Sequence, residues 1–223
     1  MIKRALVVGA FVGSVTTTSL AADTFEPKQG EVYRALFADA VLTLHLRSYL
    51  LDRTDTTPNS SDPAAWAGGG WIGYESDWIG DILKVGAVGY TSLPIWAPED
   101  RVDTLLLRDG TEGFAVLGQA YVALKFEDQI ATFYRQLVNQ PEVNLQDNRM
   151  VPNTFEAVSL KGDLGPVSYY GGYLFGMKKR NSDEFINMAK AAGVTEEDSD
   201  MWLGGLEFTP IEDLKFRTSL YAV

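Results

Sequence analysis

Basic side chains recur at alternate positions of segments whose other positions are apolar. In the segment that begins at Val41, leucines alternate with Thr43, His45 and Arg47. Successive residues of a β-strand face opposite sides of the sheet, so these polar side chains would share one face. A guanidinium binds a carboxylate through two parallel hydrogen bonds, whereas an ammonium attracts it as a point charge. The pattern therefore predicts a polar face that favours small carboxylate-bearing solutes.

Six basic residues are candidates for guiding such solutes. They are Arg47, Lys125, Arg135, Arg149, Lys215 and Arg217. Arg135 is ambiguous because Phe133 shares its face near a strand end. Arg149 lies in a loop, three residues before Pro152, and depends on the family resemblance described below. For any one of them, an ordinary solvated residue is the default interpretation. Basic residues recur on the same side of several strands, and this recurrence favours one common face that points inward. Glu75 and Glu207 are expected on the same face, so its charge is mixed.

No arrangement of residues predicts catalysis, a metal site or a cofactor. His45 is the single histidine, and the chain contains neither Gly-x-Ser-x-Gly nor a phosphate-binding loop. The stretch Asn144–Asn148 supplies oxygen atoms without the spacing of a calcium loop, so a polar turn is the favoured interpretation. We therefore expect no enzyme.

The elements that would position these residues are short alternating segments. The expected strands are 41–52, 65–75, 82–91, 115–126, 130–137, 154–160, 166–177, 201–209 and 214 onward. The connections alternate between short polar turns and long loops, and the long ones are 54–64, 92–114, 138–153 and 178–200. In the last of these loops, Asn181–Glu184 predicts the start of a helix and Gly193 its end.

This ordering predicts an all-β fold, a transmembrane antiparallel β-barrel of porin type. Such a barrel carries short turns at its periplasmic end and long functional loops at the other end. About nine strands would form an incomplete barrel over residues 41–223. Aromatic residues near the strand ends fit belts at two membrane interfaces, although aromatics also favour strands in general.

The N-terminus predicts export. Residues 1–22 resemble a signal peptide, with Lys3 and Arg4, a short apolar stretch, and small residues at Ser19–Ala22. Residues 23–40 are expected to form an N-terminal periplasmic or lumenal segment with a short helix near Glu31–Phe37. No segment has the ~18 apolar residues of a transmembrane helix.

The amino-acid composition limits the kinds of partner that the protein can bind. The chain has no cysteine, so it depends on packing or lipid rather than disulfides. Its formal net charge is −11, with acids clustered in two long loops, which argues against nucleic acid. The expected partners are small anionic or zwitterionic solutes and outer-membrane lipid, and a homo-oligomer is compatible with the pattern.

Three stretches carry a family resemblance. Gln140–Phe155 resembles the inward-folded third loop of the OprD-type porins, with a basic residue shortly before a proline. Leu44–Tyr49 resembles the family's opening strand, and Lys178–Phe185 with Ala191–Val194 resembles bacterial members outside its best-known branch. The resemblance implies a pore in the outer membrane, narrowed by the third loop and lined by basic residues. By position it assigns Arg47 to a pore-facing strand and Arg149 to the constricting loop.

The resemblance also implies more strands than this chain supplies. The chain stops at Val223 inside a strand, and nine is an odd number, whereas bacterial barrels use even numbers. We therefore expect the N-terminal half of a longer protein, and residues 23–223 alone are not expected to form a stable pore, because open edges are costly in hydrocarbon.

The expected function is diffusion of small hydrophilic solutes, such as amino acids, small peptides or organic acids, across the outer membrane. One alternative is a side-chain-filled barrel with a structural or adhesive role. The inward-facing small residues Gly69, Gly73 and Gly205 argue instead for open space. The other alternative is a soluble periplasmic β-sheet protein that binds a ligand.

Overall fold

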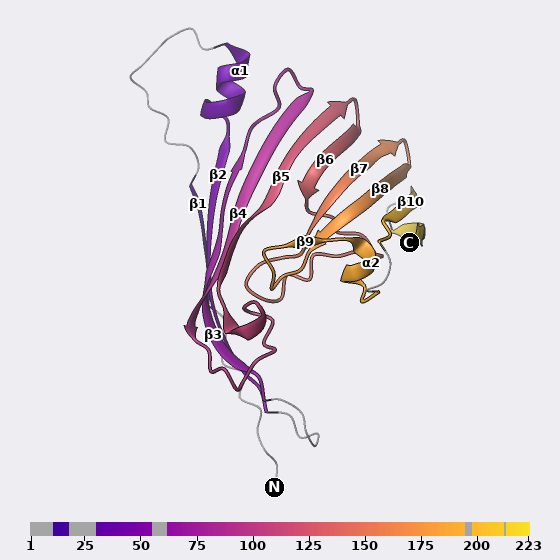
Figure 1. Ribbon diagram of the computed structural model, residues 1–223. Coiled ribbons are helices and arrows are strands. Elements are labelled where there is room, and N and C mark those ends of the chain that lie inside the picture. Colours follow the sequence, from indigo (N-terminus) through magenta and orange to yellow (C-terminus); the bar gives the residue numbers. More distant parts are fainter. Residues whose placement is uncertain (1–10, 18–29, 55–61, 195–197, 212) are drawn as a thin grey trace.

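The computed structural model describes residues 11–17, 30–54, 62–194, 198–211 and 213–223, and it forms one open antiparallel sheet. Neighbouring strands in the path follow the order β1-β2-β3-β4-β5-β6-β7-β8-β10-β11, and the short β9 pairs with β8. The strands are β1 (Phe11–Thr17), β2 (Val41–Asp52), β3 (Ala64–Glu75), β4 (Leu83–Trp96), β5 (Phe114–Phe126), β6 (Gln129–Gln136), β7 (Thr154–Leu164), β8 (Val167–Lys178), β9 (Phe185–Ile186), β10 (Met201–Ile211) and β11 (Leu214–Ala222). Figure 1 shows the sheet curving like part of a barrel wall.

All nine expected strands are present, and two additions correct the prediction. β9 has only two residues, too few for an alternating pattern to be detected. β1 pairs with the outer edge of β2, with Phe11 opposite Ser48. β1 falls within the predicted signal peptide, and the rest of that segment lies outside the described residues, so the signal peptide stays a prediction. β4 extends to Trp96, so the second long loop is shorter than expected.

The two faces of the sheet differ as the alternation predicts. Leu46 is 58% exposed and Ile72 65% exposed, and both lie on the convex side that would contact lipid. The opposite side borders a cavity of about 520 Å³ whose walls are partly polar and partly apolar. Its lining includes Gln119, Tyr121, Thr132, Gln136, Ser159 and Lys161. The sheet therefore separates an apolar outer surface from an inner side that carries most of the polar side chains of the strands.

Short turns gather at one end of the sheet and long loops at the other (Figure 1). The turn between β7 and β8 needs only Gly165 and Pro166, and Gly165 has a φ of 60°, a left-handed conformation that glycine adopts at little cost. At the other end, a 3-10 turn, η2 (Asp109–Thr111), interrupts the loop between β4 and β5. If the sheet belongs to an outer-membrane barrel, as the sequence predicts, the short-turn end is the periplasmic one.

The buried core forms between the wall and the loops that fold against its inner side. In one cluster, Leu106 and Leu107 of the β4–β5 loop and Met150 and Val151 of the β6–β7 loop pack on the wall residue Tyr90. In a second cluster, Val138 and Val143 of the β6–β7 loop pack with residues of β7, β8 and β10. The loops are therefore packed elements with fixed positions.

The helix expected in the last long loop is present but begins later. It is α2 (Met188–Ala191), and the side chain of Asn187 caps it by accepting from the amide of Ala189. Asn181–Glu184 is therefore not its N-terminus, and that part of the prediction is wrong. Gly193 follows the helix with a φ of 95°, as expected of a residue that ends it. Among the described residues, no helix is long and apolar enough to cross a membrane.

Tyrosine rings cover glycines on neighbouring strands of the wall. A Cβ atom at Gly86 would overlap the ring of Tyr121, and one at Gly205 would overlap the ring of Tyr170. In both cases the two residues are register partners. The space beside Gly205 is therefore filled by the ring of Tyr170. Gly205 is not evidence for open space in the lumen, and that part of the prediction is wrong. A Cβ at Gly69 would likewise collide with the backbone of Thr91.

Candidate functional site

The loop between β6 and β7, residues 137–153, is fastened to the wall by Arg47. The Nη1 atom of Arg47 lies 2.7 Å from the Oδ1 atom of Asp147, and it also donates to the carbonyl oxygen of Arg149. Nη2 donates to the second carboxylate oxygen at 3.3 Å. Only 9% of the Arg47 side chain is exposed, and its guanidinium carbon lies 5.2 Å from the centre of the Trp71 ring. Arg47 therefore acts as an anchor of the loop.

Further contacts hold the loop from other sides. Lys178, fully buried, donates from Nζ to the carbonyl of Pro152 at 3.2 Å, and the amide of Arg180 donates to Oδ1 of Asn153 at 2.8 Å. Near the other end, Glu142 accepts from the hydroxyl of Tyr170 at 2.9 Å. Burial opposes ionisation of Glu142, but hydrogen bonds from Ser219 and Tyr170 outweigh it and lower its pKa. The loop is thus held at both ends and at its tip.

Two arginines converge on Asn148 at the tip of this loop. Arg149 donates from Nε to the carbonyl of Thr104 at 3.0 Å and from Nη1 to the carbonyl of Asn148 at 2.8 Å. Arg180, from the loop after β8, donates from Nη1 to the side-chain oxygen of Asn148. Burial and the charge of Arg149 lower the pKa of Arg180. Neither guanidinium forms an ion pair with a carboxylate in the described part of the chain.

The other predicted site residues are paired with acids. Besides Arg47, Lys125 lies 2.6 Å from Asp81, and Arg135 lies 3.0 Å from Glu156. Lys215 and Arg217 share Glu207, at 2.9 Å and 2.6 Å. The inward-facing acid Glu156 is therefore paired with Arg135 and not with Arg149. Among the six candidates, Arg149 is the one with no ion pair in the described residues.

None of the six predicted residues lines the cavity on the inner side of the sheet, and Arg135 instead contacts a loop. Its guanidinium carbon is 4.1 Å from the centre of the Phe185 ring, and its Nη1 donates to the carbonyl of Leu117 at 3.1 Å. The register places Arg135 opposite Ala120 and Glu156. Arg135 therefore connects the wall to the loop after β8.

Sequence reasoning missed three basic residues. Arg180 and Lys178 belong to the run Lys178-Lys179-Arg180, which supported the family resemblance but was not assigned a site role. Lys161 lines the cavity and, among the described residues, has no ion pair. Lys161 lies two residues after Ser159 on β7, so the alternation of inward and outward residues could have identified it as an inward-facing residue. The position of Arg180 depends on how two loops pack together, which no local pattern shows.

A second basic cluster lies nearer the short-turn end. The Nζ atoms of Lys84 and Lys125 lie 5.2 Å and 5.6 Å from the centre of the Trp78 ring. Lys84 also lies 2.9 Å from Glu75, which accepts a hydrogen bond from Tyr121. Each lysine therefore has its own acid, and this cluster contributes little net charge.

The geometry defines a class of protein. The chain forms a curved antiparallel wall, apolar outside and polar inside, with a long loop packed against its inner side. In the described residues no group of three or more acidic, histidine or cysteine side chains could hold a metal ion. Such a wall is part of a membrane β-barrel of porin type.

The comparisons identify the family. The family model described as "outer membrane porin, OprD family" matches residues 34–222, so the chain belongs to the OprD family of outer-membrane porins. This places the protein in the outer membrane and confirms that it is not an enzyme. It also sets aside the soluble periplasmic alternative.

Solved porins share the fold. A BenF-like porin from Pseudomonas fluorescens Pf-5 superposes with a TM-score of 0.69 at 19% identity, covering 83% of this chain and 49% of that one. OccK9 (OpdG) of Pseudomonas aeruginosa gives 0.72 at 23% identity, covering 84% of this chain and 50% of its own. OccAB2 of Acinetobacter baumannii gives 0.73 at 16% identity, with the same two coverages. No curated protein matched the chain in the corresponding search.

The chain spans about half the length of these solved relatives, as the open sheet suggests.

Proposed function

We propose that the protein is a diffusion channel for small hydrophilic solutes that carry a carboxylate, such as amino acids, small peptides or organic acids. The family match supports a channel for small solutes, and the pair Arg149 and Arg180 supports the preference for carboxylates. Loop 137–153 would narrow the lumen and present this pair to passing solutes. Lys161, on the cavity wall, would extend the basic path.

The free energies fit a channel better than a tight binding site. A guanidinium 4 Å from a carboxylate contributes about 1 kcal/mol in water and about 4 kcal/mol near a protein surface. Binding in a wet lumen is therefore strong enough to bias entry and weak enough to permit release. Because Arg47, Lys125, Lys215 and Arg217 are neutralised by neighbouring acids, they would contribute less than the two unpaired arginines.

The acidic loops at the mouth oppose this preference in part. Their charge is reduced because Arg108 binds both Asp183, at 2.9 Å, and Glu112, at 2.6 Å. The ion pair between Lys190 and Asp198 has the same effect. The proposal therefore assigns selectivity to the constriction rather than to the mouth.

The arginine pair gives the test. In the full-length protein, Arg149→Gln and Arg180→Gln should each reduce the preference for anions, because each removes a positive charge with no acid partner. The reversal potential across a salt gradient in a planar lipid bilayer measures this preference. We expect a shift toward cations in each variant and a larger shift in the double variant.

Arg34→Gln is the matched control. It makes the same change in charge, but Arg34 lies at the short-turn end, away from loop 137–153, and is paired with Asp39, 3.3 Å away. Its reversal potential should equal that of the wild type. A double variant with wild-type reversal potential would remove both arginines from the selectivity mechanism.

A further inference from the structure

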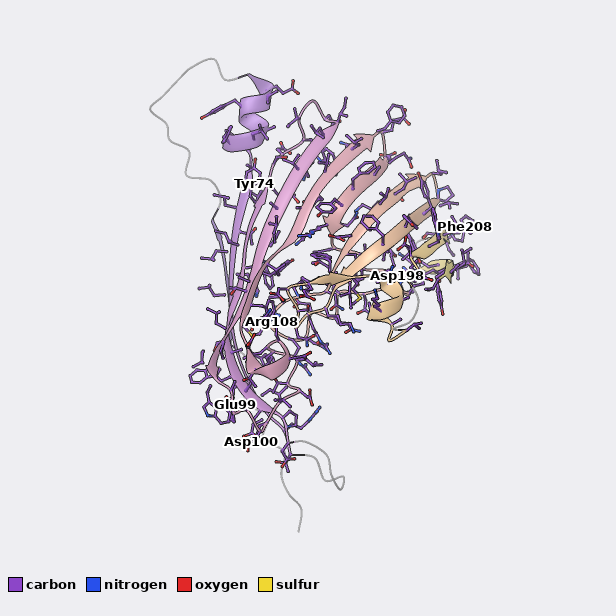
Figure 2. The ribbon with its side chains drawn as sticks, viewed as in Figure 1. Tyr74, Glu99, Asp100, Arg108, Asp198 and Phe208 are labelled. Carbon is purple, nitrogen blue, oxygen red and sulfur yellow. The ribbon has the colours of Figure 1, made fainter. Side chains whose placement is uncertain are left out.

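A short helix is attached to the periplasmic rim of the wall. It comprises α1 (Glu31–Tyr33) and the π-helical turn η1 (Arg34–Ala38). The hydroxyl of Tyr74 donates to the carbonyl of Leu36 at 2.6 Å, and the amide of Asp77 donates to the carbonyl of Ala35 at 2.9 Å. Figure 2 labels Tyr74 just beneath the helix. The helix is therefore fixed to the end of β3 and to the turn that follows it.

The attachment lies on the lipid-facing side of the wall. Tyr74 is the register partner of Leu42 and alternates with Ile72, and both of these residues are exposed on the convex face. Tyrosine is one of the aromatic residues that outer-membrane barrels concentrate where lipid meets water. The helix thus begins where the apolar band of the barrel ends.

The helix exposes large apolar side chains away from its attachment. Val32 is 55% exposed, Tyr33 46% and Phe37 64%, whereas Ala35, beside the attachment, is buried. The rings of Tyr33 and Phe37 lie together, with centroids 5.1 Å apart. The exposed Val41 and Leu42 of β2 follow this helix in the chain, after Asp39 and Ala40. Exposing an apolar surface of this kind to water is unfavourable, so we expect lipid or protein to cover it.

We propose that residues 31–38 form an interfacial helix that inserts Val32, Tyr33 and Phe37 into the periplasmic leaflet of the outer membrane. The occupant is lipid, because the helix is bonded to Tyr74 on the same strand face as the exposed Leu42 and Ile72, the face that an outer-membrane barrel turns toward lipid. Its polar residues fit the same position: Arg34 and Asp39 form an exposed ion pair at 3.3 Å, suited to the headgroup layer.

Residues 1–223 contain no cysteine, so a cysteine introduced among them is the only one in this part of the protein. Phe37→Cys and, separately, Val32→Cys would be introduced into the full-length protein, labelled with a nitroxide and reconstituted into phospholipid vesicles. Collision rates of the label with oxygen, which concentrates in lipid, and with a water-soluble nickel chelate would be measured by power-saturation electron paramagnetic resonance. Leu44→Cys serves as the lipid-facing control, and Asp128→Cys, in a short turn, as the aqueous control.

We expect the ratio of oxygen to nickel collisions at positions 37 and 32 to exceed that at position 128 severalfold and to approach that at position 44. Strong nickel collisions at both helix positions would place the helix in water and overturn the proposal. Weak collisions with both reagents would show that protein covers the helix, either another part of the barrel or a second molecule, and would overturn it equally.

Discussion

Replacing Arg47 with methionine should release the tip of loop 137–153 into the lumen. The substitution removes the two bonds to the carboxylate of Asp147 and the bond to the carbonyl of Arg149, while its apolar stem can still pack on Trp71. Hydrogen bonds of charged groups contribute about 1.5–3 kcal/mol, and Asp147 is partly exposed, so we expect a loss near the lower bound. That loss is enough to populate loop positions other than the fastened one. Single-channel recordings of the full-length protein should show new conductance levels and more frequent transitions.

Lys84→Met is the control for this experiment. Lys84 resembles Arg47 in pairing with an acid, Glu75, and in lying over a tryptophan ring, but its contacts are with the wall and the short-turn end. Because Lys84 lines the cavity, its loss should shift the size of the conductance levels but add no new level. Asp147→Asn should reproduce the Arg47→Met phenotype more weakly, because the amide can still accept one hydrogen bond. Identical recordings from Arg47→Met and wild type would contradict the anchoring role.

Gly70→Ala should prevent the barrel from folding. Gly70 has a φ of 129°, and a Cβ atom there would overlap the carbonyl oxygen of His45 on β2. Backbone strain of this kind costs about 1–3 kcal/mol, and relieving the overlap would also separate β2 from β3. Folded outer-membrane barrels resist detergent and migrate anomalously on unheated gels. The variant should lack this heat-dependent shift in full-length protein recovered from membranes.

Gly89→Ala is the control that tests whether the loss of folding is caused by the backbone conformation of Gly70 rather than by any glycine-to-alanine change in the wall. Gly89 lies on the neighbouring strand, β4, and the nearest atom to an added Cβ would be Cγ2 of Ile72 at 3.8 Å, an ordinary contact. Its φ lies outside the left-handed region, so alanine should be accepted and the gel shift preserved. A heat-dependent shift of wild-type size in Gly70→Ala would show that β2 and β3 can separate locally without loss of the barrel.

The strands and their faces could be predicted from the sequence because burial on one side of a sheet imposes a period of two residues. Leu42, Leu44 and Leu46 carry that period plainly. The order of short and long connections was equally visible, since it needs only the strand boundaries. The late start of α2 could not be read, because Asn181 and Asn187 are both reasonable caps and tertiary packing selects the second.

The pairing of charges could not be predicted from single strands. Arg47 and Asp147 are 100 residues apart, and only the folded loop brings them together. Alternation placed Lys215 and Arg217 on one face but gave no sign that both would bind Glu207 on the neighbouring strand. The convergence of Arg149 and Arg180 likewise depends on two loops whose conformations no local pattern specifies. Which cations remain uncompensated is therefore a property of the tertiary structure.

The tyrosine-covered glycines have a consequence for assembly. A slip of two residues between β4 and β5 would keep every side chain on its proper face, so hydrophobic burial alone would not reject it. It would, however, bring the ring of Tyr121 over Lys84 or Val88 instead of Gly86, and each of these has a side chain where the ring must lie. The same slip between β8 and β10 would bring Tyr170 against Leu203 or Glu207. Each tyrosine and its glycine thus act as a checkpoint that accepts one alignment of two neighbouring strands and rejects the nearest plausible errors.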